Sequence, residues 1–525
     1  MIRNIFVLCS VAVLLTACGG GSGGGASAPP TLNVSLSSSS GNATVTEGGQ
    51  ATLTTTGTAS GSVSTPVVAD VQYDTSVFAS GSAVAGSTSG TYTVSAQTRS
   101  DLAPGEYKGN VTFRLCQETA CTHVYAGSTV TYAYDIVVNL KDWATYQREP
   151  GHSGYVHLTL DPSKFAKAWE WSAPNGELLS TISSHDGTIF VSGRSSFGTI
   201  HAISASSGTQ LWSYDAPGNS LGAPGYAAGN VYVQIQTMNE TNSVTALNAS
   251  TGTYVQQMSF ASQWAGFLAP TLYSDSAYIA AGYYGNGVYA FKLADGSQTW
   301  TASDSGGSIW DGEAPAVDET YVYYYSGSAL DVFNRSTGAK VASISDPFFN
   351  WSGYSYYSGP IIGSDQNVIA FSGSAMNSGS MIDQAQVGRP LVNFSVKTGS
   401  YAWRTANVYR TAPAFHNGML FAGRKSSATL DAIKESDGSI LWSWSAPGDS
   451  TTVGNVVVVD NLVFVSTEAH IYAIDLTTHA TVWTYNAPGA LAIIPGSILV
   501  ISEGSYAGNF STIFSDGKLV AIKLM

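Results

Sequence analysis

The sequence predicts an all-β protein of two units, an N-terminal β-sandwich at residues 31–140 and an eight-bladed β-propeller at residues 143–525. Three observations support this prediction. Only 11% of the 525 residues are charged and 56 are glycine, against roughly 25% charged residues in an average soluble protein. Short segments of alternating polarity fill the first unit, and a unit of about forty residues recurs through the second. Few charges and many glycines argue against long helices, and 44% hydrophobic residues suffice for a core.

The charge balance excludes one class of partner. The chain carries 21 Lys and Arg residues against 35 Asp and Glu residues, a net charge of −14, and no basic run interrupts this excess. A nucleic-acid partner requires clustered basic residues that release counterions from phosphates. We therefore expect no nucleic-acid binding.

The first residues predict an export signal. Residues 1–17 begin with a short segment that contains Arg3 and continue as an apolar stretch from Ile5 to Ala17. This stretch is shorter than the ~20 residues that a membrane-spanning helix needs, so it fits a cleaved signal peptide.

A lipid anchor is expected directly after this signal. The run Leu15-Thr16-Ala17-Cys18 resembles a bacterial lipobox, and Cys18 would then carry the lipid. The alternative is an ordinary signal peptide with an incidental cysteine. Residues 18–30 form a Gly/Ser-rich tether of the kind that an anchored protein needs. Gly19 after the cysteine implies, by resemblance to enteric-type lipoproteins, an outer-membrane location whose periplasmic or surface face stays open.

Residues 31–140 alternate Thr, Val and Ser between turn residues, as in 51–56 and 130–138. This period of two predicts an antiparallel sandwich. The stretch from Pro104 to Cys116 resembles bacterial immunoglobulin-like modules, in which a Pro-Gly turn leads into a Gly-x-Val-x-Phe strand. The resemblance implies a spacer, with an adhesion unit as the alternative.

Cys116 and Cys121 are expected to form a disulfide. Two ligands without a second pair nearby make a poor zinc site, and the periplasm is oxidising. Metal binding by this pair is the weaker alternative.

The repeat from residue 143 onward consists of short strands, a Gly-containing turn and a tryptophan. Its copies are separated by 39 to 44 residues, with one interval of 61, and the corresponding positions in two copies hold Gln256 and Ala342. Such a period with four short strands per unit is typical of a β-propeller. The tryptophans at the repeated position are Trp169, Trp212, Trp300, Trp403, Trp442 and Trp483.

The two ends of the repeat region complement each other. Residues 517–525 match the third strand of a repeat unit and are not followed by a fourth. Residues 159–169 match the fourth strand and its tryptophan, without the first half of a unit before them. We expect the first and last strands to pair, which would close a ring of eight blades and remove its exposed edges.

The repeat Ala-Ile/Phe-x-x-x-x-Gly-x-x-x-Trp, as in 202–212, resembles the pyrroloquinoline-quinone-type propeller repeat. The resemblance implies that the six repeated tryptophans pack between neighbouring blades as a structural girdle. The 61-residue unit, with its insertion at 377–388, could project a specialised loop.

Soluble quinoprotein dehydrogenases share this repeat, which makes a quinone-dependent dehydrogenase the less favoured alternative. That family's cofactor site implies adjacent cysteines and a calcium held by Glu, Asn and Asp. No two cysteines are adjacent here, and none lies in 143–525. The eight histidines show no metal-ligand spacing, and we interpret His152 and His157 as packing or surface residues at the entry to the propeller. We expect no catalytic residue, cofactor or metal.

One aromatic cluster, at residues 346–360, is a candidate ligand surface. Exposed Trp and Tyr side chains can stack on sugar rings or anchor a polypeptide. The alternative is that these aromatics are blade core. Trp264 and Trp310 could line the same face. The candidate residues are Phe348, Phe349, Trp351, Tyr354, Tyr356 and Tyr357.

The combination of signal, lipobox and repeat is similar to the BamB family of envelope lipoproteins. The resemblance implies a monomeric, membrane-anchored scaffold that binds a protein partner in outer-membrane assembly, without chemistry. This chain departs from that family by carrying an immunoglobulin-like module, so the identity of its protein partner stays open. A surface adhesin or glycan-binding lipoprotein is the second interpretation.

Overall fold

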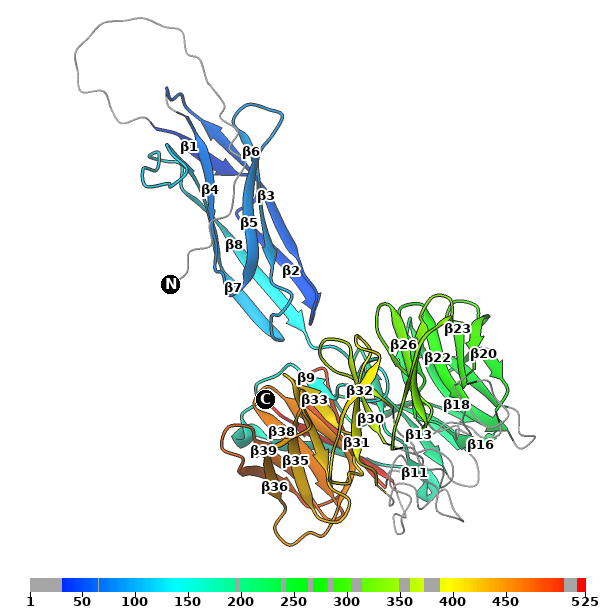
Figure 1. Cartoon of the computed structure of the whole chain (residues 1–525). Helices are drawn as coiled ribbons and strands as arrows, with labels where there is room; N and C mark the ends of the chain where they lie inside the picture. Colours follow the sequence, from blue (N-terminus) through cyan, green and yellow to red (C-terminus); the bar gives the residue numbers. More distant parts are fainter. Residues whose placement is uncertain are drawn as a thin grey trace, which may run out of the picture. The chain divides into compact units, whose positions relative to one another are not determined.

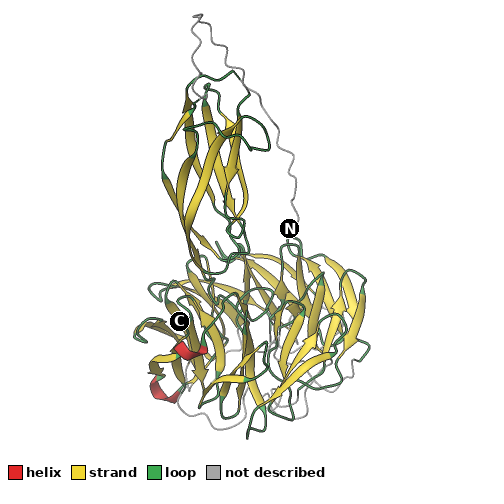
Figure 2. Cartoon of the chain, turned by 90° about the vertical axis from the view of Figure 1, so that its left-hand side faces the viewer, coloured by secondary structure: helices red, strands yellow, loops and turns green. Residues whose placement is uncertain are grey.

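The computed structural model describes residues 31–525 except 65, 195–197, 217, 238–241, 263–267, 282–286, 304–313, 349–358, 373–387 and 505–516. The chain divides into two compact units, Met1–Lys141 and Asp142–Met525 (Figure 1). Strands dominate both units (Figure 2), and the described helices are two short 3-10 turns, η1 (Pro162–Lys164) and η2 (Pro174–Gly176). Within the described part of the chain, no helix has the length and apolar character needed to cross a membrane.

The first unit contains two four-stranded sheets, ordered β1-β3-β6-β5 and β2-β8-β7-β4. Strand β2 runs parallel to β8, and the other described pairings are antiparallel. The strands are β1 (Asn33–Leu36), β2 (Ser40–Thr46), β3 (Thr52–Ser60), β4 (Val68–Gln72), β5 (Phe78–Ala85), β6 (Thr91–Thr98), β7 (Gly105–Cys116) and β8 (Val130–Asn139).

The core of the first unit lies between its two sheets. Leu53 on β3 and Phe78 on β5 pack in one cluster with Val111 on β7 and Ile136 on β8. Every second residue of these strands points inward, so β3 alternates exposed Thr with buried side chains. The first unit is therefore a β-sandwich.

The described part of the second unit forms eight sheets, numbered 1 to 8 in chain order. Sheet 1 contains β11 (Leu178–Leu179), β12 (Ser183–His185), β13 (Thr188–Arg194), β14 (Gly198–Ser204) and β15 (Gln210–Ala216). Sheet 2 contains β16 (Gly218–Leu221), β17 (Gly225–Ala227), β18 (Asn230–Thr237), β19 (Asn242–Asn248) and β20 (Tyr254–Phe260). Sheet 3 contains β21 (Thr271–Tyr273), β22 (Ser276–Ala281), β23 (Gly287–Lys292) and β24 (Gln298–Ala302).

Sheets 4 to 8 repeat this pattern. Sheet 4 contains β25 (Ala316–Val317), β26 (Tyr321–Tyr325), β27 (Ala329–Asn334) and β28 (Lys340–Ser345), and sheet 5 contains β29 (Ile361–Ile362), β30 (Asn367–Phe371), β31 (Leu391–Ser395) and β32 (Ser400–Arg404). Sheet 6 contains β33 (Ala414–His416), β34 (Met419–Gly423), β35 (Thr429–Lys434) and β36 (Ile440–Ser445). Sheet 7 contains β37 (Thr452–Val459), β38 (Leu462–Thr467), β39 (Ile471–Asp475), β40 (Thr481–Tyr485) and β9 (Tyr155–Val156). Sheet 8 contains β41 (Ala490–Ile494), β42 (Ile498–Glu503), β43 (Lys518–Lys523) and β10 (Ala166–Ser172).

Neighbouring sheets meet through strands on one side of each sheet. Strand β17 contacts β21, β21 contacts β25, β25 contacts β29, and β37 contacts both β33 and β41. The last sheet also meets the first, because the Ser502 hydroxyl donates to the Ser180 carbonyl. The sheets thus surround a common axis lined by these contacting strands, which is the arrangement of a β-propeller.

Sheet 8 is built from both ends of the repeat region. Strand β10, which precedes sheet 1 in the sequence, pairs antiparallel with β43 near the C-terminus, and Trp169 lies opposite Ala521. Because the two ends share one sheet, β43 has no open edge.

Candidate functional site

The axis of the propeller is occupied by residues 142–160, here termed the axial segment. This segment hydrogen-bonds to sheets 1 to 7 in turn, with contacts on or beside β12, β17, β21, β25, β29, β33 and β37. Six bonds join backbone groups, and in the seventh the Thr145 hydroxyl donates to the Pro270 carbonyl. The axial residues and their partners are Trp143 with Ser184, Ala144 with Tyr226, Thr145 with Pro270, Pro150 with Val317, Gly151 with Ile362, Ser153 with Phe415, and Gly154 with Val458.

Several side chains of the axial segment are buried and hydrogen-bonded. The Gln147 amide donates to the carbonyls of Pro413 (2.8 Å) and Val456 (3.2 Å), and accepts from the Asn455 amide at 2.8 Å. Gln147, Arg148 and His152 also have positive φ angles of 48°, 81° and 63°. Such backbone costs roughly 1–3 kcal/mol per residue, so it persists only where surrounding contacts determine it.

His152 is fully buried in this segment. Its Nδ1 lies 2.8 Å from the Pro360 carbonyl oxygen, and its Nε2 lies 3.3 Å from the Thr271 hydroxyl. A neutral ring that donates from Nδ1 and accepts at Nε2 satisfies both contacts. Burial lowers the pKa of His152 to about 4, against smaller opposing effects from Glu149 and the Pro360 carbonyl. His152 is thus a packed, neutral residue, whereas His157 is partly exposed, 3.7 Å from Asp460.

The repeated tryptophans contact the following sheet. The indole Nε1–H of Trp169 donates to the Ala205 carbonyl at 2.8 Å, and Trp212 and Trp300 make the same bond to Ala249 and Arg335. Trp403 donates likewise to the Glu435 carbonyl. The glycine of the following turn lies against each indole: Gly208, Gly252, Gly338 and Gly438.

The remaining copies vary this contact. Gln256 replaces the indole, and its amide donates to the Leu293 carbonyl at 2.7 Å. Trp442 stacks on His479 with ring centroids 4.3 Å apart, and Trp483 packs edge-on against Phe165.

The aromatic candidate cluster is described at one residue. Phe348 is 38% exposed, contacts the Tyr401 ring edge-on, and lies under the Arg404 guanidinium at 4.6 Å. The other candidates lie outside the described residues: Phe349, Trp351, Tyr354, Tyr356, Tyr357, Trp264 and Trp310.

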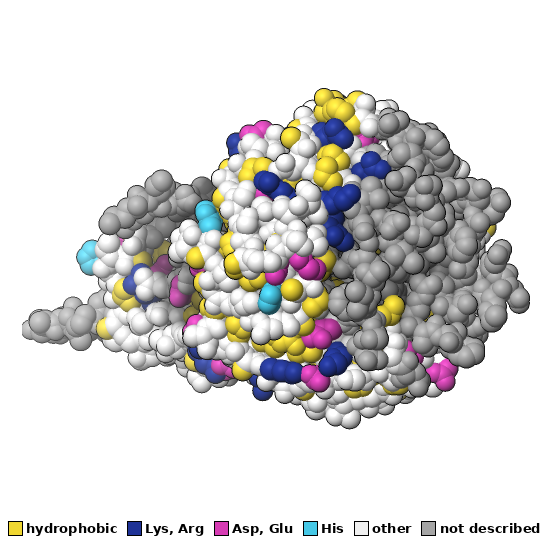
Figure 3. Space-filling model, turned by 90° about the horizontal axis from the view of Figure 1, so that it is seen from below, with side chains coloured by type: hydrophobic (Ala, Val, Ile, Leu, Met, Phe, Trp, Pro, Cys, Tyr) yellow, Lys and Arg dark blue, Asp and Glu magenta, His cyan; other side chains and the backbone are white. Residues whose placement is uncertain are grey.

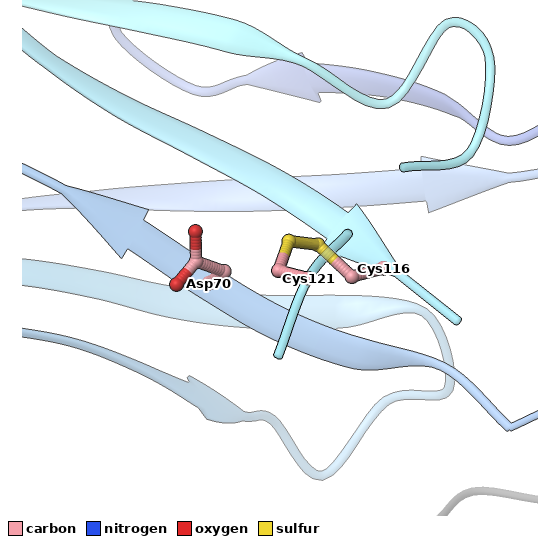
Figure 4. Close-up of side chains that lie close together, drawn as sticks. All are labelled: Asp70, Cys116 and Cys121. Atoms are coloured by element: carbon pink, nitrogen blue, oxygen red, sulfur yellow. A yellow bond between two sulfur atoms is a disulfide. The ribbon is translucent and has the colours of Figure 1, made fainter. Parts of the chain in front are cut away.

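Cys116 and Cys121 are joined by a disulfide beside Asp70 (Figure 4). These three residues are the one group of potential metal ligands in the described part of the chain. Thiolates are the form of cysteine that binds zinc, and both sulfurs are consumed in the disulfide. The Asp70 carboxylate instead accepts from Arg114 Nε at 2.6 Å. Cys18 lies outside the described residues.

A shallow groove of about 710 Å³ crosses strands β2, β8 and β7 of the sandwich. Lys108 lies 3.3 Å from Asp135 in this groove. Hydroxyl, amide and charged groups line it, from Ser40, Asn42, Lys108, Asn110 and Asp135.

A basic patch lies on three backbone segments that pair with one another, because Tyr409 forms antiparallel bridges with Arg389 and Arg424. Figure 3 shows the molecule from below, with Lys and Arg side chains in the upper part and along the lower edge of this view. We define the basic patch as Arg389, Val408, Arg410 and Lys425. Neither the patch nor the hydrogen bonds of the axial segment were found from the sequence, because the patch combines three separate segments and the residues before Thr159 carry no repeat motif.

Comparison with known proteins gives one family. The family model described as "Outer membrane protein assembly factor BamB" matches residues 153–375 and 388–525. No curated protein sequence matches the chain.

Solved structures resemble the chain distantly. BamB from Moraxella catarrhalis is 15% identical, with a TM-score of 0.48 over 68% of this chain and 97% of that one. Quinohemoprotein alcohol dehydrogenase from Comamonas testosteroni is 13% identical, with a TM-score of 0.49 over 73% and 80%. A europium-containing methanol dehydrogenase is 11% identical, with a TM-score of 0.43 over 73% and 98%. With TM-scores below 0.5, these likenesses assign no function to the chain.

Proposed function

Because this chain belongs to the outer membrane protein assembly factor BamB family, we propose that it is a non-catalytic envelope lipoprotein whose propeller is a scaffold for a protein partner. The match over 153–375 and 388–525 carries this proposal. We interpret the eight sheets as blades of one closed ring, preceded by an immunoglobulin-like spacer.

The axial segment supports a scaffold role. Residues 142–160 fill the axis with buried, hydrogen-bonded side chains such as Gln147 and His152. Binding is therefore assigned to the outer faces and loops of the ring, where a polypeptide can be recognised without chemistry.

The alternative of a quinone-dependent dehydrogenase has little support from the residues. The chain lacks adjacent cysteines, and residues 143–525 contain no cysteine. A disulfide-backed quinone site therefore does not fit this propeller.

Membrane attachment is proposed through Cys18. Metabolic labelling with a fatty acid should acylate the wild-type chain, and Cys18→Ala should abolish the label and release the protein from membranes. Acylation that persists in Cys18→Ala would contradict the anchor. Cys9→Ala, inside the expected signal peptide, is the matched control and should leave labelling unchanged.

The scaffold role is tested by affinity purification of the full-length chain from detergent-solubilised membranes. Co-purification of outer-membrane β-barrel proteins at a fixed ratio would support the proposal. Purification of the chain alone, after crosslinking in the intact envelope, would overturn it.

The sandwich groove supports a second candidate function, glycan binding by a surface lipoprotein. Amide and hydroxyl groups such as Asn42, Asn110 and Ser40 can recognise sugar hydroxyls. On a glycan array, Asn42→Ala should lose the signal and Asn139→Ala, at the end of β8, should keep it. An array without signal for the wild-type chain would remove this candidate.

A further inference from the structure

Strand β5 forms one edge of the sandwich, since it ends the sheet order β1-β3-β6-β5 and pairs with β6 alone among the described strands. The Gly86 N–H donates to the Thr91 carbonyl at 2.8 Å, so at this point the backbone faces β6. Successive residues of an antiparallel pair alternate between facing the neighbouring strand and facing away from it. The N–H groups of Gly81, Ala83 and Ala85 therefore face away from β6, and no backbone group in the described part of the chain accepts from them.

The sequence of β5 does not protect this edge from another strand. Natural edge strands are commonly blunted by charged residues, proline or bulges, because their unpaired backbone groups otherwise invite further pairing. Residues 78–85 read Phe-Ala-Ser-Gly-Ser-Ala-Val-Ala, without charge or proline. A bulge lies at the start, between Phe78 and Ser80, and the residues from Ser80 to Ala85 follow the register of β6 without interruption. This stretch is therefore open to a further strand.

A small pocket of about 50 Å³ lies at the end of β5. Ala85 and Gly86 contribute to its lining, together with Leu32, Val67 and Leu115 from other segments of the sandwich. Leu32 and Leu115 belong to a core cluster, and Val67 packs against this cluster while it is only partly buried. A small apolar side chain in this pocket would therefore contact the core of the sandwich.

Partly buried apolar side chains continue along the side of the sandwich where β5 approaches β4. A Cβ atom added to Gly81 would lie 3.1 Å from Cγ1 of Val71 on β4, so the two strands are close there. Ala83 on β5 and both Ala69 and Val71 on β4 are partly buried and pack against the same core cluster. Alternate residues of an added strand point toward the sandwich, so they would remove this apolar surface from water.

We propose that the free edge of β5 binds an extended segment of a partner polypeptide in which apolar and polar residues alternate. The segment accepts hydrogen bonds from the N–H groups of Gly81, Ala83 and Ala85, and its inward side chains cover Val71 and enter the pocket. In such pairing, main-chain bonds provide affinity and pockets for alternate side chains provide specificity. A second copy of β5 fits less well, because its inward residues are glycine and alanine. The inference goes beyond the proposed function, in which the sandwich is a spacer.

The test titrates the full chain into a fluorescein-labelled peptide of ten alternating Val and Thr residues with a lysine at each end, and measures fluorescence anisotropy. Ala83→Pro removes an N–H group that faces the free edge and keeps the bonds to β6, a position at which edge strands tolerate proline. This variant should weaken peptide binding at least tenfold. The matched control Ala83→Ser keeps the N–H group and should change binding less than twofold. Urea unfolding of both variants checks that the sandwich is folded.

Ala85→Leu tests the pocket and leaves the backbone of β5 unchanged. A leucine side chain at the pocket wall would fill the space, so the peptide should bind at least fivefold more weakly. Val84→Leu is the matched control, because Val84 is 62% exposed on the opposite face of β5, and it should change binding less than twofold. A peptide with Ser in place of every Val should bind the wild-type chain at least fivefold more weakly, because it buries less apolar surface.

Two results would overturn the inference. Equal binding by the wild-type chain and Ala83→Pro would show that the peptide does not pair with β5. Dimers of the wild-type chain in analytical ultracentrifugation that are lost in Ala83→Pro, without binding to the peptide, would assign the edge to self-association. The affinity purification tests the scaffold separately: a chain that binds the peptide through β5 and co-purifies no barrel protein refutes the scaffold and keeps this inference.

Discussion

A single glycine in the following turn makes room for the indole of Trp169, Trp212, Trp300 and Trp403. A Cβ atom added to Gly252 would lie 2.6 Å from the Trp212 indole, and the residue has a φ of +70°. Only glycine adopts this backbone without strain while leaving room for the ring. Gly399 provides a comparison, because the preceding repeat has Ala342 at the tryptophan position. Nothing lies within 4 Å of a Cβ atom added to Gly399.

Gly252→Ala should therefore destabilise the propeller more than Gly399→Ala. Both changes place Ala at positive φ, which costs roughly 1–2 kcal/mol, and only the first adds a clash with the indole, worth about 1–3 kcal/mol more. The free energy of unfolding in urea measures both. Equal losses would show that Trp212 moves aside freely.

His152 should make stability depend on pH. Its folded-state pKa, lowered to about 4 by burial, lies below the unfolded value of ~6.5. Between these values the unfolded chain binds a proton that the folded chain does not, so stability falls as the pH falls. The loss should reach about 3 kcal/mol between pH 7 and pH 4.

His152→Gln cannot take up this proton, so unfolding in urea at several pH values should show a shallower decline for it. The control for the His→Gln change itself is His123→Gln, at a side chain that is 73% exposed. Parallel curves for wild type and His152→Gln would contradict the prediction.

At the scale of elements, the axial segment links sheets that are far apart in the sequence. Gln147 alone hydrogen-bonds residues beside β33 and on β37. Removing its amide leaves buried acceptors without partners, which costs about 1–3 kcal/mol.

Gln147→Ala should accordingly lower the free energy of unfolding by about 2 kcal/mol. Gln257→Ala is the matched control, because Gln257 is exposed and contacts only Ser259 among the hydrogen bonds described. A change below 0.5 kcal/mol for Gln147→Ala would mean that water replaces the lost bonds.

Elements differ in how far the sequence predicts them. The all-β class and the quinone-type propeller repeat were predicted and are confirmed by the family match. Alternation and the turn-plus-tryptophan pattern are local properties, so they can be recognised in one sequence. From the sequence, Gln256 is only a replacement of the repeated tryptophan. In the structure its amide donates to a backbone carbonyl of the following sheet, as the indole does in other repeats.

At the scale of the whole molecule, the chain consists of two units with separate cores. Cys116 and Cys121 close a short loop within the first unit. A cross-link of this length stabilises by about 2 kcal/mol in the chain-entropy account, and its removal should affect the sandwich alone.

Calorimetry of the full chain should therefore show two transitions. Replacing both Cys116 and Cys121 with Ser should lower the temperature of one transition and leave the other in place. A shift of both transitions would show that the two units unfold together.

The sequence by itself determined the strand-rich class, the repeat and its tryptophan positions, because each follows from residues within about forty positions of one another. The lipid anchor at Cys18 and the domain limits remain predictions. Only the tertiary structure decided what fills the axis and where charge gathers. Gln147 bonds Val456 and His152 bonds Pro360, while Arg410 joins Lys425 through Thr451. Such contacts arise when a closed ring brings distant residues together, and no local pattern in the chain encodes them.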